Sequence, residues 1–218
     1  MQVAARTEVG HVRSRNEDAM YVAASLGVLA VADGLGGHPD GDLASRTVTA
    51  HLEETVDAAP PPGGEATAGW LVESLLAAHR AVLAVAAQDD ARTGMATTAV
   101  LGVLGAEELW LAHVGDSRAY LLPAADDLRP LTRDHGLGGY ITQALGLDRG
   151  IEPDVTHLPV AAGDRVLLCT DGLTNMVSDK EIARLLGEGD VQRAVDGLVD
   201  AALAAGGIDN VTVVVAEA

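Results

Sequence analysis

The sequence contains very few aromatic residues and one cysteine. Of its 218 residues, 2% are aromatic and none is phenylalanine, so a core must be built mainly from leucine, valine, alanine and isoleucine. The single cysteine, Cys169, excludes a disulfide within the chain and a zinc cluster made of cysteines. It lies in the apolar run 166–169 and is predicted to be a buried core thiol.

Basic residues are also scarce. Fourteen lysines and arginines stand against 32 aspartates and glutamates, which gives a formal charge of −18. A general nucleic-acid binder needs a basic surface, and a protein attracted to anionic lipid needs basic clusters. The composition therefore argues against nucleic acid and membrane as partners. It is compatible with a site that collects divalent cations.

Long hydrophobic runs are missing as well. No stretch approaches the roughly 20 apolar residues that a membrane helix needs, and the first residues lack the basic-then-apolar order of a signal peptide. We therefore expect a soluble cytoplasmic protein, and a monomer. Because 48% of the residues are apolar, one domain with a full core is expected over residues 1–218.

The apolar patterns predict an α+β fold. Strands are expected within 1–34, and helical spacing predicts long helices on either side of the proline run 60–62. The predicted helices are 40–58, 65–88, a short one at 139–147, 179–187 and 190–205; the later strands are 97–104, 108–114, 118–122, 166–170 and 211–215, with a loop at 123–135. This order is not the regular alternation of a doubly wound sheet. It predicts mostly antiparallel sheets with helices packed outside.

Aspartates stand at the ends of several predicted strands. Asp33, Asp116 and Asp171 follow apolar runs, each directly beside a glycine, and Asp209 precedes the last strand. If that strand runs antiparallel to its neighbours, all four carboxylates can lie at one edge of the core. Buried anions are costly unless a cation compensates them. The pattern therefore indicates a cation site.

The donor atoms favour a hard cation. Oxygen ligands without histidine or thiolate suit Mg²⁺ or Mn²⁺, and two such ions would hold and polarise a water that attacks phosphorus. Gly34, after Asp33, lets the backbone turn sharply and leaves its carbonyl free as a ligand. Asp-Gly after a strand is by itself an ordinary turn signal, so the four aspartates together carry the inference.

A charged segment, residues 13–18, supplies a complementary group. The guanidinium of Arg13 could clamp two phosphate oxygens in a bidentate fork near a metal pair. Arg13 lies five residues before Asp18, so an extended backbone could place the two at opposite ends of a site. The alternative is a solvated charged loop, and composition alone does not choose between them.

Seven strings of residues, in order from Thr7 to Val215, resemble a known family. They are Arg13–Asp18, Val31–His38, Gly94–Thr98, His113–Arg118, Leu131–His135, Cys169–Leu173 and Asp209–Thr212. Together they look like the protein phosphatase 2C (PP2C, PPM) family of metal-dependent serine/threonine phosphatases, in its bacterial form. The resemblance implies a β-sandwich flanked by helix pairs and a centre of two Mn²⁺ or Mg²⁺ ions. It also implies hydrolysis of phosphoserine and phosphothreonine on proteins by a metal-bridging water.

The resemblance implies roles for individual residues. Asp33, Asp171 and Asp209 would be direct ligands of the metal pair, and Gly34 would ligate through its carbonyl. Turnover would depend on Asp33 and Asp171, with Arg13 as the group that binds the substrate phosphate.

Two further acidic positions match the family pattern. Glu17 and Asp18 correspond to the acidic pair that supports the second metal, with Asp18 acting through water. Asp116 corresponds to the acid that holds a third, weaker metal in bacterial members.

The sequence departs from the family in two places. Bacterial members carry a flap subdomain of a few dozen residues, whereas only Gly136–Thr142 lies between the matching strings here. This near absence leaves substrate preference and the third metal open. Animal-type members also have a histidine where Leu35 stands. His38 is nearby as an alternative proton donor, and the other histidines show no ligand spacing and are expected at the surface or in structural roles.

Two other functions are alternatives for this sequence. The glycine-rich loop 34–39 lacks the pattern of a dinucleotide site, because Pro39 stands where glycine or alanine is required, and it lacks a P-loop lysine. The second alternative is a catalytically silent module that binds phosphoproteins on the same fold. The expected partners are phosphorylated proteins: kinases, their targets or phosphorylated regulators.

Overall fold

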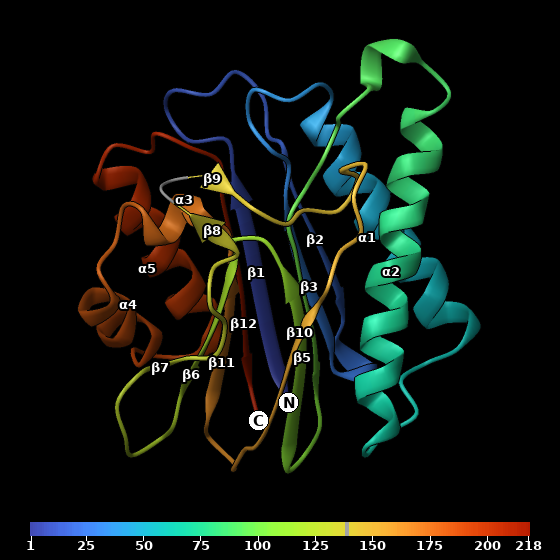
Figure 1. The fold of residues 1–218 in the computed structure, drawn as a ribbon. Coiled ribbons are helices and arrows are strands. Elements are labelled where there is room, and N and C mark those ends of the chain that lie inside the picture. The colour runs from blue at the N-terminus through green and yellow to red at the C-terminus, as the bar shows by residue number, and fades with distance from the viewer. Residues whose placement is uncertain (138–139) are drawn as a thin grey trace.

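The computed structural model describes residues 1–137 and 140–218, and it contains two antiparallel sheets packed face to face (Figure 1). The order of strands in the first sheet is β1 (Gln2–Glu8), β12 (Val211–Glu217), β11 (Arg165–Cys169), β6 (Arg118–Leu122) and β7 (Arg129–Pro130). The order in the second is β10 (Asp154–Pro159), β5 (Glu108–Val114), β4 (Ala99–Leu104), β3 (Val28–Asp33) and β2 (Asp18–Ala23). A separate hairpin joins β8 (Gly136–Leu137) to β9 (Tyr140–Ile141).

Helices cover the outer faces of both sheets (Figure 1). The second sheet carries α1 (Gly41–Ala58) and α2 (Ala66–Ala86), and the first carries α4 (Asp179–Leu186) and α5 (Val191–Ala204). Short helical turns occur at η1 (Ala24–Leu26), η2 (Asp90–Arg92) and α3 (Asp171–Thr174). The predicted α+β sandwich, with its α-β-β-α layers, is confirmed.

Three apolar layers follow from strands that are buried on both faces. In β3, Leu29 and Val31 lie between the sheets, whereas Val28, Ala30 and Ala32 face α1 and α2, because successive side chains of a strand point to opposite faces. A third layer joins the first sheet to α4 and α5.

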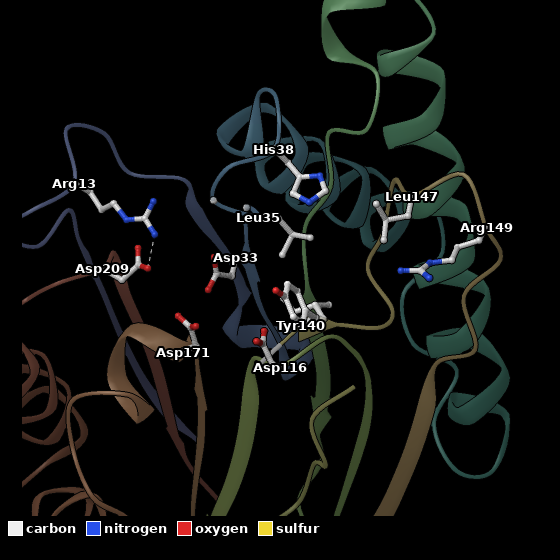
Figure 2. Close-up of a pocket in the computed structure, with 13 residues that line it drawn as sticks. Arg13, Asp33, Leu35, His38, Asp116, Tyr140, Leu147, Arg149, Asp171 and Asp209 are labelled. Carbon is white, nitrogen blue, oxygen red and sulfur yellow. Dashed lines mark hydrogen bonds and ion pairs between the residues drawn. The ribbon is translucent and has the colours of Figure 1, made fainter. Parts of the chain in front are cut away.

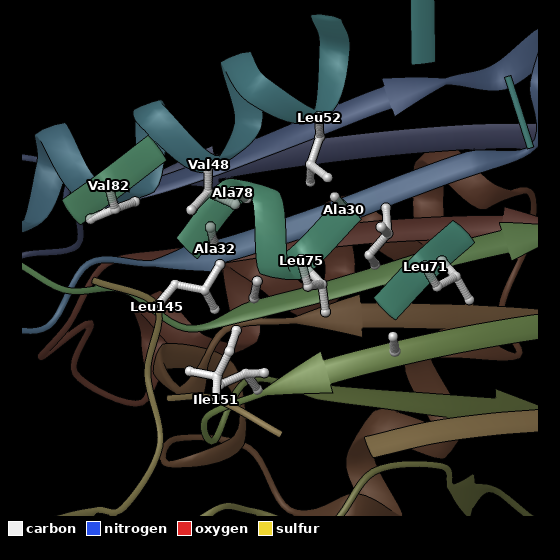
Figure 3. Packing of buried hydrophobic residues seen from close by; sticks show 14 of the residues in the cluster. Ala30, Ala32, Val48, Leu52, Leu71, Leu75, Ala78, Val82, Leu145 and Ile151 are labelled. Atoms are coloured by element: carbon white, nitrogen blue, oxygen red, sulfur yellow. The ribbon is translucent and has the colours of Figure 1, made fainter. Parts of the chain in front are cut away.

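The long helices bury one stripe each. Val48 and Leu52 of α1, and Leu71 and Leu75 of α2, are spaced four residues apart and pack onto the second sheet (Figure 3). This spacing places side chains on one helix face. Both helices therefore form because each covers the sheet with an apolar stripe.

Helix α2 corrects one expectation. It is long and apolar enough to cross a membrane by length and composition alone, although no such stretch was expected from the sequence. Such helices also occur in the cores of soluble proteins. In this structure the buried stripe of α2 packs on β4 and β5.

The structure also differs from the predicted elements in the second half of the chain. The helix expected at 139–147 is wrong: residues 140–141 form β9 and 142–147 are irregular, while residue 139 lies outside the described residues. The edge strand β10 was missed, because its mostly exposed residues lack an apolar run. The segment expected as a loop, 123–135, contains the short strand β7.

We predict that Leu75→Ala lowers the free energy of unfolding by about 2–5 kcal/mol, because it leaves a cavity under α2 where no side-chain surface is exposed. Urea denaturation followed by circular dichroism measures the change. The matched control is Leu26→Ala, because Leu26 is 44% exposed and should cost far less. Equal losses for both variants would contradict the proposed core.

Candidate functional site

Four aspartates meet at the end of the sandwich opposite the two chain termini (Figures 1 and 2). Asp33 ends β3, Asp116 lies between β5 and β6, and Asp171 follows β11. Asp209 comes two residues before β12, which is antiparallel to β11, so Asp209 returns to the same edge as Asp171. All four line one cleft of about 360 Å³. The convergence predicted from the strand ends is confirmed.

Like charges act on one another in this cleft. Burial raises the pKa of Asp33 well above its usual value, and the carboxylates of Asp18, Asp171, Asp116 and Asp209 raise it further. Burial is likewise the first cause that raises the pKa of Asp116 to about 6, followed by the charge of Asp171. The pKa of Asp171 is also raised, by burial and then by Asp209. A cation in the cleft would relieve this repulsion.

Asp18 lies directly opposite Asp33 in the β2–β3 ladder and is buried. Its Oδ2 accepts hydrogen bonds from the hydroxyls of Thr170 (2.8 Å) and Thr212 (2.7 Å), whereas its buried Oδ1 has no partner among the described residues. Burial raises the pKa of Asp18 to about 7. A buried carboxylate oxygen without a partner is unusual and fits a contact to a cation through water.

Glu17, the other acid of this pair, forms an ion pair with Arg15 instead of facing Asp33 with an unpartnered oxygen. Its carboxylate accepts from Arg15 Nε at 2.9 Å, and its backbone carbonyl accepts from Gly34 N and Ser45 Oγ. Of the two acids, Asp18 is therefore the one that acts on Asp33.

Gly34 is required for close packing rather than for a turn. A Cβ at this position would lie 2.3 Å from the Gly41 carbonyl oxygen and 2.7 Å from that of Glu17. Gly34 has no left-handed backbone angle, so a positive φ is not the reason for glycine at this position. Its carbonyl oxygen accepts no hydrogen bond from the described residues and remains available as a ligand.

Glycine is required at position 172 for close packing as well. Asp171 begins the helical turn α3 instead of a loop. A Cβ on Gly172 would lie 1.9 Å from the backbone carbonyl oxygen of Asn210. The glycine thus lets the segment after β11 touch the segment before β12, which brings Asp171 beside Asp209.

Threonines that were not singled out hold the backbone of Asp33. Asp33 N donates to Thr98 Oγ1 at 3.0 Å, and Thr97 Oγ1 donates to the Asp33 carbonyl at 2.8 Å. Thr98 Oγ1 also lies 2.7 Å from Ser117 Oγ, beside Asp116. These contacts link two aspartates from different strands. The strings 94–98 and 113–118 pointed to these residues but did not reveal their role.

Asn210 fixes the segment that carries Arg13. Its Nδ2 donates to the carbonyls of Val9 and Arg15, and its Oδ1 accepts from Glu17 N. The Nη2 of Arg13 then donates to Asp209 Oδ2 at 2.6 Å, and this bond raises the pKa of Arg13. Arg13 therefore lines the cleft (Figure 2) from a surface loop whose residues 11–15 are exposed.

Arg118 and Asp134 join two further strings of the sequence. Arg118 Nε and Nη2 donate to both carboxylate oxygens of Asp134, at 2.8 and 2.7 Å. This bidentate pair anchors the segment before the β8–β9 hairpin to β6. It therefore fixes the base of the hairpin close to Asp116.

The histidines correct another expectation. Ligand atoms of His113, His135 and Asp154 lie within 4.8 Å of one another, so these residues form a cluster that linear spacing did not show. Their atoms already have partners: His113 Nε2 bonds with the Arg133 carbonyl and Gly115 N donates to His135 Nδ1. His135 Nε2 lies 3.2 Å from Asp154 Oδ2. The rings of His113 and His135 stack. The structural role expected for these two histidines agrees with these contacts.

His38 and the short hairpin border the cleft. His38 Nδ1 lies 2.9 Å from the Gly94 carbonyl, and its ring stands on the rim (Figure 2). Tyr140 of β9 also lines the cleft and is 80% exposed. The segment that stands in place of a flap subdomain is thus the β8–β9 hairpin, which has two residues in each strand.

The fold and the cleft define an α-β-β-α sandwich domain with an all-oxygen donor set suited to hard divalent cations. A family model described as protein phosphatase 2C matches residues 9–204. The chain therefore belongs to the protein phosphatase 2C family.

Similar proteins agree with this assignment. The chain is 37% identical to the serine/threonine protein phosphatase PstP of Mycobacterium tuberculosis over 100% of its own length and 45% of that protein. It is 31% identical to the serine/threonine phosphatase stp of Listeria innocua, over 97% of this chain and 94% of that one. The solved catalytic domain of PstP, in complex with two manganese ions, is 38% identical with a TM-score of 0.84, over 99% of this chain and 97% of that chain.

The chain spans less than half of the PstP sequence that it matches. The alignment runs over 237 residues although this chain has 218, so at least 19 aligned positions have no residue here. A shortened flap agrees with this difference.

We predict that, without added metal, raising the pH from about 6.5 to about 8 destabilises the protein by about 1 kcal/mol. The reason is that Asp18 (pKa about 7) and Asp33 have higher pKa values when folded than when unfolded. The folded state then holds more protons, and its stability is lost as pH rises through these values. Urea unfolding in EDTA at several pH values measures the loss.

Asp33→Asn is the matched variant for this experiment. It removes one of the repelling charges and should make the pH dependence shallower, while Mn²⁺ should stabilise wild type more than the variant. Identical slopes in both proteins would contradict the repulsion between Asp33 and the neighbouring carboxylates.

Proposed function

We propose that the protein hydrolyses phosphoserine and phosphothreonine on other proteins at a centre of two Mn²⁺ or Mg²⁺ ions. One observation carries the proposal: Asp33 lies among Asp18, Asp116, Asp171 and Asp209 at the end of the sandwich. Its burial raises its pKa, and the charges of these four carboxylates raise it further. A family match over residues 9–204 and the manganese complex of the PstP domain support it.

The residues present fit two hard cations. Asp33, Asp171 and Asp209 would bind them through carboxylates and Gly34 through its carbonyl, while Asp18 Oδ1 would act through water. When bound, such ions supply a nucleophilic water at neutral pH and compensate the charge of the phosphate. Asp116, on the side of Asp171, would hold a third ion.

Arg13 would orient the phosphate. Only its Nη2 is engaged by a described residue, Asp209, so the other guanidinium nitrogens can donate to two phosphate oxygens in a planar fork. Asn175 donates to Asp171 Oδ2 at 3.0 Å and holds that carboxylate toward the cleft. These contacts support a phosphate site between Arg13 and the aspartates.

The proposal extends to partners and location. Phosphorylated proteins, among them kinases, their targets or phosphorylated regulators, would be the substrates of a cytoplasmic monomer. A net charge of −18 supports the absence of nucleic acid among the partners.

The experiment is hydrolysis of a phosphothreonine peptide and of p-nitrophenyl phosphate, each with Mn²⁺, with Mg²⁺ and with EDTA. We expect turnover with metal and its loss with chelator. Folded protein without turnover under any metal would instead favour the silent binding module.

We predict that Asp171→Asn lowers kcat by about 100-fold or more, because it removes the charge of a metal ligand without changing its volume. The fold should be retained, since the pKa of Asp171 is raised by burial and by Asp209 and the variant relieves this repulsion. Steady-state kinetics and thermal unfolding test both parts. Asp57→Asn, at the exposed end of α1, is the control, and equal loss in it would contradict the assignment.

A further inference from the structure

The cleft is wider than the metal centre. One side of the cleft carries Asp33, Asp116, Asp171 and Asp209, with Arg13 bound to Asp209, and is called the acidic side here. The opposite side is formed by Leu147, Arg149 and the hairpin residues Tyr140 and Ile141 (Figure 2). A volume of about 360 Å³ falls in the range that holds a whole small ligand. A phosphate on the acidic side therefore leaves room for a neighbouring part of the substrate.

Arg149 is a cation of this cleft that no carboxylate engages among the residues described. Most arginines of this acidic chain form salt bridges, and the other cleft arginine, Arg13, is bound to Asp209. Arg149 is exposed and its guanidinium turns toward the cleft from the wall opposite Asp209 (Figure 2). Its charge is thus available to a ligand.

The loop that carries Arg149 is anchored. Arg149 N donates to the Leu147 carbonyl at 2.7 Å, and Leu147 packs with the buried residues Leu35, Ala96 and Ala144 beneath the cleft. Leu35 also ties this wall to the backbone next to the metal centre, because its N donates to the Ala96 carbonyl. Packing of Leu147 therefore fixes this loop against the cleft wall, and Arg149 projects from the loop two residues further on.

We propose that Arg149 is a specificity-determining residue that contacts an anionic group beside the phosphorylated residue of the substrate. The anion is either an aspartate or glutamate side chain or a second phosphate, since both suit a guanidinium fork. This inference rests on the proposed phosphatase function. The net charge of −18 would by itself favour basic substrates, but charges beyond about 10 Å are largely screened at physiological salt, so the nearby cation dominates.

The test uses phosphothreonine peptides that differ at one neighbouring residue: glutamate, glutamine, lysine or phosphoserine. Wild type should show kcat/KM about fivefold higher for glutamate than for glutamine, as expected for an exposed ion pair. Arg149→Ala should bring this ratio to about one, and Arg149→Glu should favour lysine over glutamate. Mass spectrometry of the phosphoserine peptide shows which phosphate leaves and whether a second phosphate is preferred to glutamate.

Arg80→Ala is the matched control, because Arg80 is an exposed arginine of α2 that does not line the cleft. It should keep the wild-type ratio, whereas a general effect of net charge would change it as much as Arg149→Ala does. A wild-type ratio near one, or the same ratio in wild type and Arg149→Glu, overturns the proposal for Arg149. Metal-dependent turnover of p-nitrophenyl phosphate separates that failure from a failure of the phosphatase function itself.

Discussion

Repulsion among carboxylates around Asp33 is the interaction on which the rest of the site depends. Asp18, Asp116, Asp171 and Asp209 all raise the pKa of Asp33, in addition to its burial. A flexible chain would separate such charges. The sandwich keeps them together because each is attached to a strand end in a core that is apolar on both sides of both sheets. The stability of the core thus supports a destabilised cluster whose natural counterpart is a pair of cations.

The polar contacts around the cleft serve this arrangement. Thr97 and Thr98 hold the backbone of Asp33, and Asn210 holds the segment that presents Arg13. Gly172 permits the contact between the segments that carry Asp171 and Asp209. These residues need not touch the phosphate. They fix geometry, which is what a preorganised site requires.

The two sides of the cleft differ in their residues and in the roles proposed for them. In the proposed function, the side with Arg13 and the aspartates would act on a phosphate that every substrate shares. The other side carries the small β8–β9 hairpin and the loop of Arg149. In the proposed function, so short a hairpin would leave substrate preference to a few exposed side chains such as Arg149 and Tyr140.

The sequence by itself determined the layered fold, the long helices and the aspartates at strand ends, because apolar periodicity and residue type are local properties. It did not determine β10, whose exposed edge has no apolar run, nor the irregular path after Ile141. Only the tertiary structure decided that Gly34 serves close packing, that His113 and His135 meet, and that Arg149 faces the cleft. These are distances between segments far apart in the chain, and packing and strand register set them.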